Sequence, residues 1–281
     1  MGNENLSKAK NSKNDEFYTQ YDDIQNEINF YHAYDPNVFR NKTIFLPCDD
    51  PEWSDFTKFF VTNFEKYGLK KLISTSYAYT SKKVNFPYQQ LLFDFEKESP
   101  QFDYDKSVSR GKIFTLTKDT SNKKIDYDDL KWDYLEGDGD FRSQECVDLI
   151  KEADIVITNP PFSLFRQFIE HIFKYNKKFL IIGSKNVISY KEIFPLIRDN
   201  HIWLGRTSVK KFMTISENGK EWKQFGNIGW FTNIEHGARY DWLKLLTMEE
   251  NLIYDKRLIK SVREAAQRSN YHTLSMITIM Q

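Results

Sequence analysis

Hydrophobic and polar positions alternate in blocks along the chain, and the first clear block predicts a strand, a helix and a second strand. Residues 43–47 form a short apolar run that ends in a polar turn over residues 48–51. Residues 52–67 follow with aromatic side chains at helical spacing, and Gly68 ends this helix. Residues 71–77 supply a second strand, so we expect a right-handed crossover between parallel strands.

The same alternation returns in the second half of the chain. A helix over residues 143–152 precedes the apolar strand 154–158, and a helix over 164–175 precedes the apolar strand 178–183. Strands without a polar face are typical of parallel sheets that helices cover on both sides. These segments predict an α/β fold with a mostly parallel sheet.

A region in the middle of the chain interrupts this pattern. Residues 80–129 contain two short apolar runs, at 90–95 and 112–116, with a polar segment between them. Bounded runs of this length predict strands. We therefore expect an inserted hairpin or excursion at about residues 80–129.

The last third of the chain has an antiparallel pattern. Short strands are predicted at residues 201–204, 208–215 and 227–234. Asn218-Gly219 lies between two of them and is a strong hairpin signal. Two further helices with several basic residues are predicted within residues 242–281.

Composition and charge limit the class of protein. With 40% hydrophobic and 28% charged residues, and no apolar run near the roughly 18 residues that cross a membrane, we expect a cytoplasmic protein without a membrane partner. Two cysteines, Cys48 and Cys146, and five scattered histidines form no metal-ligand spacing, so no metal is expected. The net charge of +0 counts modestly against nucleic acid, although a local basic groove can exist in a neutral chain.

A rigid turn directly after the strand at 154–158 carries the sharpest chemical signal: Asn159, Pro160, Pro161 and Phe162. An Asn side-chain oxygen and a backbone carbonyl can accept both protons of an aromatic-ring amine, whose lone pair is otherwise delocalised. Pro160 supplies a carbonyl and no competing N–H donor. Phe162 offers a face on which an extruded base can stack. These four are the expected catalytic residues.

This turn resembles the catalytic motif of amino-methyltransferases that use S-adenosyl-L-methionine, and three further segments resemble the same enzymes in order. The segment around Tyr18 is similar to Glu-Phe-Tyr-Thr-Pro, with Gln20 in the proline's place. Asp49-Asp50-Pro51 stands where the first cofactor motif is, without its usual glycines. Asp138-Gly139-Asp140-Phe141 resembles the Gly-Asp-Phe element near the cofactor's adenine. The resemblance implies these cofactor-binding residues: Phe17, Tyr18, Thr19, Asp49, Asp50, Pro51, Asp138, Asp140 and Phe141.

The implied roles differ among these residues. Tyr18 and Thr19 would contact the methionine end of the cofactor, and Asp49 would accept a hydrogen bond from its amine. Asp140 would accept from the adenine amine while Phe141 packs on the ring. Without the resemblance, Asp50-Pro51 is also explained as an ordinary start of a helix, because Asp is a good N-cap and Pro suits the first helical position.

The order of these segments resembles the gamma arrangement of amino-methyltransferases. With Gly229-Trp230-Phe231-Thr232-Asn233 late in the chain, it resembles more narrowly the EcoRI-type adenine-specific DNA methyltransferases. This implies a Rossmann-like methyltransferase fold with a mostly parallel sheet, an antiparallel strand and insertions. It also implies methylation of adenine N6 in a specific double-stranded DNA sequence by base flipping. We expect a flexible tail over residues 1–13, a catalytic core over 14–200, and a C-terminal part over 201–281 that completes the sheet and recognises the target.

Basic residues around the Asn-Gly hairpin are the expected DNA contacts: Arg206, Lys210, Lys211, Lys220 and Lys223, with Trp222 and Phe225 interleaved. Such residues bind phosphates, and the hairpin could read a groove or fill the gap left by a flipped base. A solvated hairpin face explains the same residues. The expected partners are double-stranded DNA and a cognate restriction endonuclease of the same system.

Two kinds of alternative remain open at this point. The same motif serves amino-methyltransferases that act on ribosomal RNA adenine or on a protein glutamine, although Phe162 and the turn at 48–51 favour DNA. A catalytically silent DNA-binding accessory protein could retain the fold. The intact turn at Asn159 argues against such decay.

Overall fold

The computed structural model describes residues 18–78, 99–118, 131–216 and 219–240, together with positions 247 and 260. The chain divides into two units, Met1–Arg239 and Tyr240–Gln281. Several expectations lie outside the described ranges: the tail 1–13, Phe17, the strand at 90–95 and the two helices within 242–281. None of the described helices is long and apolar enough to cross a membrane.

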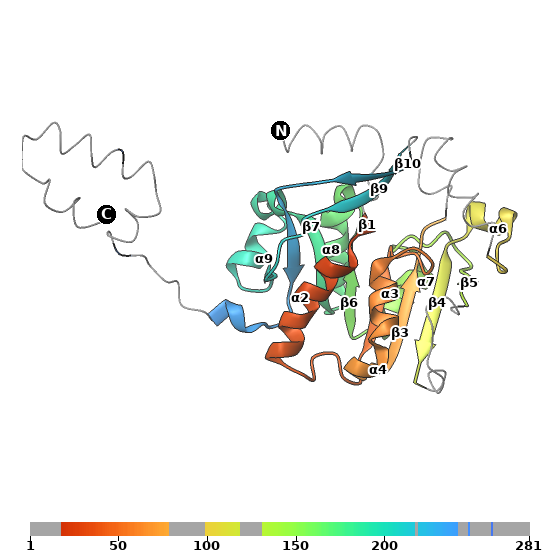
Figure 1. The fold of residues 1–281 in the computed structure, drawn as a ribbon, viewed down its shortest axis with the longest axis horizontal. Coiled ribbons are helices and arrows are strands. Elements are labelled where there is room, and N and C mark those ends of the chain that lie inside the picture. Colours follow the sequence, from red (N-terminus) through yellow and green to blue (C-terminus); the bar gives the residue numbers. More distant parts are fainter. Residues whose placement is uncertain are drawn as a thin grey trace, which may run out of the picture. The chain divides into compact units, whose positions relative to one another are not determined.

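The first unit is built around an eight-stranded sheet with the order β5-β4-β3-β2-β6-β7-β11-β8 (Figure 1). The strands β3, β2, β6 and β7 are parallel to one another, and β4 and β11 run antiparallel to their neighbours. The bounds are β2 (Thr43–Pro47), β3 (Lys71–Thr75), β4 (Lys112–Thr117), β5 (Asp133–Tyr134), β6 (Ile155–Thr158), β7 (Lys178–Ser184), β8 (Trp203–Leu204) and β11 (Ile228–Thr232). The expected mostly parallel α/β sheet is confirmed, with two antiparallel strands rather than one.

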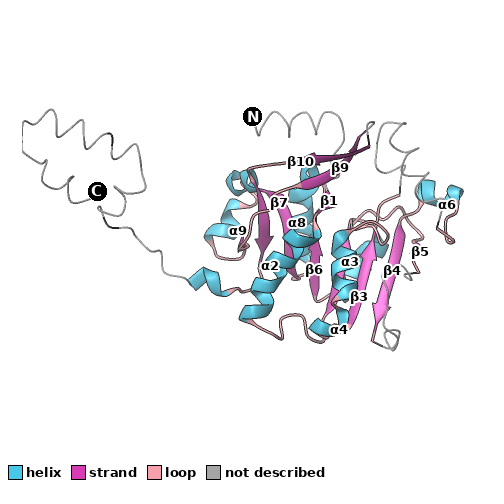
Figure 2. Ribbon diagram, in the orientation of Figure 1, coloured by secondary structure: helices cyan, strands magenta, loops and turns pink. Residues whose placement is uncertain are grey.

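Helices cover both faces of this sheet, as Figure 2 shows, with α2 and α3 on the near side. Alternate residues of β2 explain the two layers: Ile44 and Leu46 pack in one core with α2 and α3, whereas Phe45 packs in a second core with α7 and α8. The helices are α2 (Tyr21–Tyr34), α3 (Asp55–Thr62), α4 (Phe64–Tyr67), α6 (Tyr104–Ser109), α7 (Gln144–Glu152), α8 (Phe165–Lys174) and α9 (Phe194–Arg198), with short 3₁₀ turns η2 (Phe162–Leu164), η3 (Lys185–Ser189) and η4 (Gly237–Tyr240).

A second, antiparallel sheet joins the two ends of the first unit. Its order is β1-β9-β10, from β1 (Tyr18–Thr19), β9 (Phe212–Ser216) and β10 (Gly219–Lys223). The pairing of Gly219 with Ser216 confirms a hairpin at the predicted position, but its second strand is β10, whereas the predicted strand 227–234 corresponds to β11 of the central sheet. Thr19 pairs with Phe212, so the N-terminal segment lies beside a strand from the last third of the chain.

Helix boundaries follow local capping chemistry. The Ser54 hydroxyl accepts from the Phe56 amide (3.1 Å), so α3 begins at Asp55 and not at residue 52 as predicted. The expected single helix is broken at Asn63, whose side chain donates to the Phe59 carbonyl (2.9 Å). Gly68 ends α4 in the left-handed conformation, as predicted.

Two expectations about the elements need correction. Residues 112–117 were expected in an inserted excursion, but they form β4 of the central sheet, hydrogen-bonded along the whole of β3. Helix α2 was not predicted at all. Its inner face includes buried Asp23 and Glu27, so acidic residues interrupt the apolar spacing by which a helix is recognised in a sequence.

Gly139 has a conformational role in the loop that carries the expected adenine contacts. Its φ is +79°, and a β-carbon there would collide with the carbonyl oxygen of Ser76 at the end of β3. The Ala78 amide donates to the Asp138 carbonyl (2.7 Å) beside it. Glycine therefore lets this loop lie directly against the end of β3.

Gly139→Ala should lower the free energy of unfolding by roughly 2 kcal/mol or more, because the left-handed backbone alone costs an L residue about 1–2 kcal/mol and the collision adds to it. Gly226→Ala is the matched control, since a β-carbon at Gly226 meets nothing within 4 Å. Denaturant unfolding of the three proteins measures the difference. Equal midpoints for the two variants would contradict this role of Gly139.

Candidate active site at the switch point of the sheet

The strand order of the central sheet reverses at β2. The chain proceeds from β2 outward to β3 and β4 on one side, and then returns to β6 and β7 on the other. In open α/β sheets ligands bind at the carboxyl ends of the strands where the order reverses. Here the loop after β2 begins with Cys48 and Asp49, and the loop after β6 begins with Asn159. The fold therefore brings the expected cofactor turn and the expected catalytic turn together.

Asp49 joins these two loops through its buried carboxyl group. The side chain is 5% exposed. Its Oδ1 accepts from the Ser54 hydroxyl at the start of α3 (2.8 Å), and its Oδ2 contacts the hydroxyl of Thr158, the residue before Asn159 (2.6 Å). The Asp49 amide donates to the Thr75 carbonyl at the end of β3 (2.9 Å). One residue thus connects β2, β3, β6 and α3.

The contacts of Thr158 are both satisfied when Asp49 carries a proton. Its hydroxyl contacts both the Pro47 carbonyl and Asp49 Oδ2, yet a hydroxyl has one proton to donate. Both contacts become hydrogen bonds when the Asp49 carboxyl donates to Thr158 and Thr158 donates to Pro47. Burial raises the pKa of Asp49 to about 7 and outweighs the hydrogen bonds from Thr158 and Ser54 to the ionised carboxylate, which lower it.

This geometry corrects the role expected for Asp49. A carboxyl group that is buried and bonded on both oxygens to its own chain is not presented to the amine of a bound cofactor. Asp49 instead sets the relative position of the loops after β2 and β6.

Cys48 takes the place of the glycine that the first cofactor motif usually has. Its φ is +70°, so the backbone makes the left-handed turn that glycine favours. Burial raises the pKa of its thiol well above the ordinary value, and Asp49 raises it further in its ionised form. The thiol therefore stays protonated at neutral pH, which makes it a poor nucleophile.

Asp50 belongs to a charged cluster that sequence reasoning missed. Its Oδ2 lies 3.3 Å from Lys112 Nζ, and the same ammonium lies 2.6 Å from Glu52 Oε2. Lys112 is 3% exposed and lies over the ring of Trp132, 4.8 Å from its centroid. A lone lysine at a strand start gives no signal in the sequence, because only the β3–β4 pairing brings it to this edge. Pro51 is buried in the same turn.

The N-terminal segment reaches the same edge of the sheet. The Tyr21 amide donates to the carboxylate of Asp55 in the first turn of α3 (3.1 Å), which holds β1 beside the loop after β2. Thr19 is 4% exposed, and its hydroxyl oxygen has no hydrogen-bond partner within the described part of the chain. A buried hydroxyl in this state is suited to a polar group of a ligand. Of Tyr18 the structure describes the backbone pairing with Met213.

The acidic loop near the end of β3 is ordered by its own contacts. Asp140 forms hydrogen bonds with Arg142 through the backbone amide (2.8 Å) and Nε (2.9 Å), and Asp138 accepts from the Asp140 amide (3.0 Å). Burial acts to raise the pKa of Asp140, but the hydrogen bonds and charge of Arg142 outweigh it and lower the pKa. The carboxylate is therefore ionised at neutral pH, and both of its oxygens accept hydrogen bonds from Arg142.

Phe141 is a core residue, which corrects the expectation that it packs on an adenine ring. Its side chain is 0% exposed and lies edge-to-face with Phe168 of α8, with 5.0 Å between ring centroids. The Phe141 amide donates to the hydroxyl of Tyr77 (3.3 Å). Tyr77 is only partly buried at the end of β3, and the sequence analysis did not single it out.

The expected catalytic turn is partly open to solvent. Asn159, Pro161 and Phe162 are partly exposed, whereas Pro160 is buried. The Pro161 carbonyl accepts from the Leu164 amide (2.9 Å), which closes the turn into η2. The Phe162 ring lies edge-to-face with Phe212 of β9, 6.1 Å between centroids. The turn is therefore held against the same strand that pairs with the N-terminal segment.

The expected DNA contacts fall into two groups. Arg206, Lys210 and Lys211 are exposed on the loop before β9. Lys223 is partly buried on β10, and the structure describes only the backbone pairing of Lys220 with Ile215.

The two aromatic residues of the hairpin differ from each other. Trp222 is 58% exposed on β10, as the expected DNA surface requires. Phe225 is 6% exposed and packs on Phe212, with 5.8 Å between centroids, so it belongs to the core and not to the interleaved surface.

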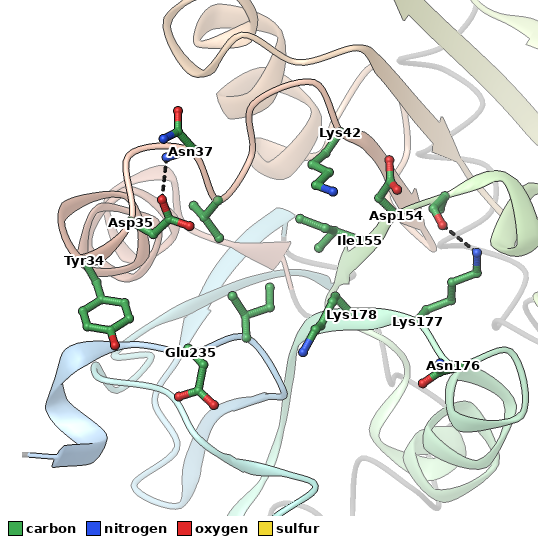
Figure 3. Close-up of a pocket in the computed structure, with 13 residues that line it drawn as sticks. Tyr34, Asp35, Asn37, Lys42, Asp154, Ile155, Asn176, Lys177, Lys178 and Glu235 are labelled. Atoms are coloured by element: carbon green, nitrogen blue, oxygen red, sulfur yellow. Dashed lines mark hydrogen bonds between the residues drawn. The ribbon is translucent and has the colours of Figure 1, made fainter.

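A cavity of about 480 Å³ lies at the opposite edge of the sheet, at the amino ends of β2, β6 and β7 (Figure 3). Lys42, Asp154 and Lys178 are among its lining residues. Lys177 donates to the carbonyl of Ala153 (2.8 Å), and Lys178 donates to that of Asn233 (3.0 Å), so these two ammonium groups bind the protein's own backbone. The cavity is remote from the turn at Asn159, since β6 separates them.

Comparison with known proteins gives one family for nearly the whole chain. Residues 5–256 match the model of the adenine-specific methyltransferase EcoRI family. The Type II methyltransferase M.EcoRI of Escherichia coli is 39% identical over 86% of this chain and 72% of the relative. M.MgeORF184P of Mycoplasma genitalium is 35% identical over 82% and 64%, and M.MpnI of Mycoplasma pneumoniae is 29% identical over 85% and 67%. No solved structure gives a significant match.

Asp49→Asn should preserve the site, because the amide can donate to Thr158 and accept from Ser54 as the protonated acid does. A carboxyl whose pKa is raised on folding contributes stability below its ordinary pKa and loses it as the pH rises through about 7. The free energy of unfolding of Asp49→Asn, relative to the native protein, should therefore rise by about 1.4 kcal/mol per pH unit between pH 4 and 7. Denaturant unfolding at several pH values measures this, with the exposed Asp148→Asn as the control.

Calorimetry with S-adenosylmethionine completes this test. Asp49→Asn should bind within several-fold of the native protein, whereas Asp49→Ala should bind more weakly because the two loops lose their connection. If Asp49→Asn loses as much affinity as Asp49→Ala and shows no altered pH dependence, then Asp49 contacts the ligand directly.

Proposed function

The chain belongs to the EcoRI family of adenine-specific methyltransferases and is a site-specific adenine DNA methyltransferase, and we propose that it methylates adenine N6 at the turn Asn159–Phe162. The observation that carries the proposal is the junction at Asp49 and Thr158, which places the catalytic turn beside the loop after β2. The proposed oxygen acceptors for the target amine therefore lie next to the edge of the sheet at which a ligand would bind.

Membership of the family implies S-adenosyl-L-methionine as the methyl donor. The residues at the edge of the sheet fit such a ligand, since Thr19 offers a buried hydroxyl without a described partner and Asp140 offers an ionised acceptor. Tyr18, Asp50, Pro51 and Asp138 complete the proposed contacts, together with Phe17. When bound there, the cofactor supplies an electrophilic methyl group.

The residues of the turn have separate tasks in this proposal. The Asn159 side-chain oxygen and the Pro160 carbonyl accept the two protons of the target amine, which directs its lone pair out of the ring plane and toward the donor. The prolines keep these acceptors fixed before the base arrives, so little reorganisation is needed. Phe162 stacks on the flipped base from one side and is itself supported by Phe212. The protonated thiol of Cys48 takes no part, so transfer is direct.

Double-stranded DNA is the proposed macromolecular partner. Arg206, Lys210 and Lys211 are exposed on one short loop and would bind phosphates, which fix register without reading sequence. The exposed Trp222 on β10 is available to contact bases. We extend the proposal to a cognate restriction endonuclease in the same system, because the relatives are named Type II methyltransferases.

The alternative acceptors are not favoured by this family. An enzyme that methylates ribosomal RNA adenine or protein glutamine is expected to match another family than the adenine-specific methyltransferase family that matches residues 5–256. A silent accessory protein is not favoured either.

Asn159→Ala should reduce turnover by three orders of magnitude or more, since it removes one of two oxygen acceptors that act only on the reacting amine. Affinity for S-adenosylmethionine should stay within several-fold, measured by calorimetry. Ser163→Ala in the same turn is the control, because Ser163 is exposed and lies outside the proposed machinery. Parallel loss of cofactor binding and turnover in Asn159→Ala would show that Asn159 is structural.

Expression of the protein in cells that lack adenine methylation should yield N6-methyladenine at one short sequence motif. Sequencing of genomic DNA with detection of modified bases gives substrate and specificity together. The Asn159→Ala variant should leave the DNA unmodified. Modified RNA with unmodified DNA would contradict the proposal.

A further inference from the structure

Helix α2 buries a carboxylate that bonds to the backbone of a distant loop. Glu27 is 0% exposed, and its Oε2 accepts from the amide and the hydroxyl of Thr207 (both 2.6 Å). Its Oε1 accepts from the Arg206 amide (2.9 Å) and from the Tyr31 hydroxyl (3.0 Å). All four partners are donors, as an ionised carboxylate requires. Burying such a group is costly unless it is fully bonded, and an apolar side chain would stabilise a core at least as well.

The loop is shaped to admit this carboxylate. A β-carbon at Gly205 would collide with Glu27 Oε1 and would lie 2.6 Å from Trp230 Cβ. The Gly205 amide meanwhile donates to the Trp230 carbonyl of β11 (2.9 Å). Only glycine lets the backbone turn from the sheet edge so that successive amides point at Glu27.

A second carboxylate one turn earlier in α2 extends the attachment. Asp23 is 9% exposed and accepts from the Lys210 amide (3.1 Å). Positions 23 and 27 lie on one face of the helix, so the two acids bind one continuous segment. Val209 between the attachment points is buried at 2% exposure. The backbone is thereby fixed at positions 206, 207 and 210, while the side chains of Arg206, Lys210 and Lys211 remain exposed.

We propose that Glu27, with Asp23, is a positioning residue that holds the loop from Gly205 to Lys211 in the conformation that presents its three cations to DNA phosphates. This inference rests on the proposed DNA surface. It accounts for the burial of two acids on a face where apolar residues are usual. It also connects proposed DNA binding with proposed cofactor binding through α2, because β1, which contains Thr19, directly precedes this helix.

The main test compares Glu27→Gln with Tyr31→Phe. Glutamine keeps the size of the side chain but turns an NH₂ group toward one set of donors, so the loop should detach. Tyr31→Phe removes one bond to Glu27 and leaves the hydrogen bonds to the loop in place. DNA affinity is measured over a series of salt concentrations with a duplex that carries the methylated motif. Loss of one contact between a cation of the protein and a DNA phosphate reduces the magnitude of the slope of log K against log salt concentration by about 0.9.

The expected result is a decrease in DNA affinity of roughly ten-fold for Glu27→Gln at moderate salt, with a slope smaller in magnitude by about 1 to 3. KM for DNA should rise while kcat at saturating DNA and affinity for S-adenosylmethionine stay within about two-fold. Tyr31→Phe should resemble the native protein in DNA affinity and slope. Should Glu27→Gln fail to fold, Thr207→Val provides a milder break of the same attachment, and Thr207→Ser should restore binding.

A variant with alanine at Arg206, Lys210 and Lys211 separates this inference from the proposed function. If that variant binds DNA as the native protein does, the proposed DNA surface is wrong. If it binds weakly while Glu27→Gln and Thr207→Val keep native affinity and slope, the positioning role is wrong. Equal decreases of DNA and cofactor affinity in Glu27→Gln would show a general structural role and would also overturn the inference. In the triple-alanine background, Glu27→Gln should change the slope no further.

Discussion

The hydrogen bonds of the buried Asp49 carboxyl group are the constraint on which the site depends. They join the loop after β2 to Thr158, and Thr158 directly precedes Asn159 of the proposed catalytic turn. Strand pairing alone aligns β2 with β6 through Ile44 and Phe45, which leaves the loops beyond the strands free to diverge. A hydrogen bond inside a low-dielectric core is directional. It therefore sets the distance between the loop after β2 and the turn at Asn159 more closely than apolar packing could.

A second set of contacts connects this site to the rest of the first unit. Phe162 of the catalytic turn packs on Phe212, Phe212 packs on Phe225, and β9 pairs with the N-terminal segment. The β1-β9-β10 sheet, which contains Thr19, is therefore in contact with the turn at Phe162. Aromatic edge-to-face contacts of this kind transmit position because the rings have few rotamers. The loop before β9, proposed to bind DNA, and Phe162, proposed to stack on the base, thus both contact or adjoin the same strand.

Buried acids have two different roles in this protein. Asp49 joins the loops after β2 and β6, whereas Glu27 and Asp23 accept backbone amides of a loop from the last third of the chain. Each binds main-chain or hydroxyl groups and not a basic side chain. Lys112, between Asp50 and Glu52, is the contrasting case in which opposite charges are buried together.

The sequence by itself determined the alternating elements, the turn at Asn159 directly after β6 and the family, because these depend on local periodicity and on short motifs with fixed spacing. It also located the Asn-Gly hairpin and the glycine that ends α4. It did not reveal α2, the place of β4 in the central sheet, the buried state of Phe141, or the attachment of Asp49 to Thr158. Those features depend on which side chains meet across the fold. Only the tertiary structure decided them, since a carboxylate in a sequence is expected on the surface until the donors that surround it are brought together from distant strands.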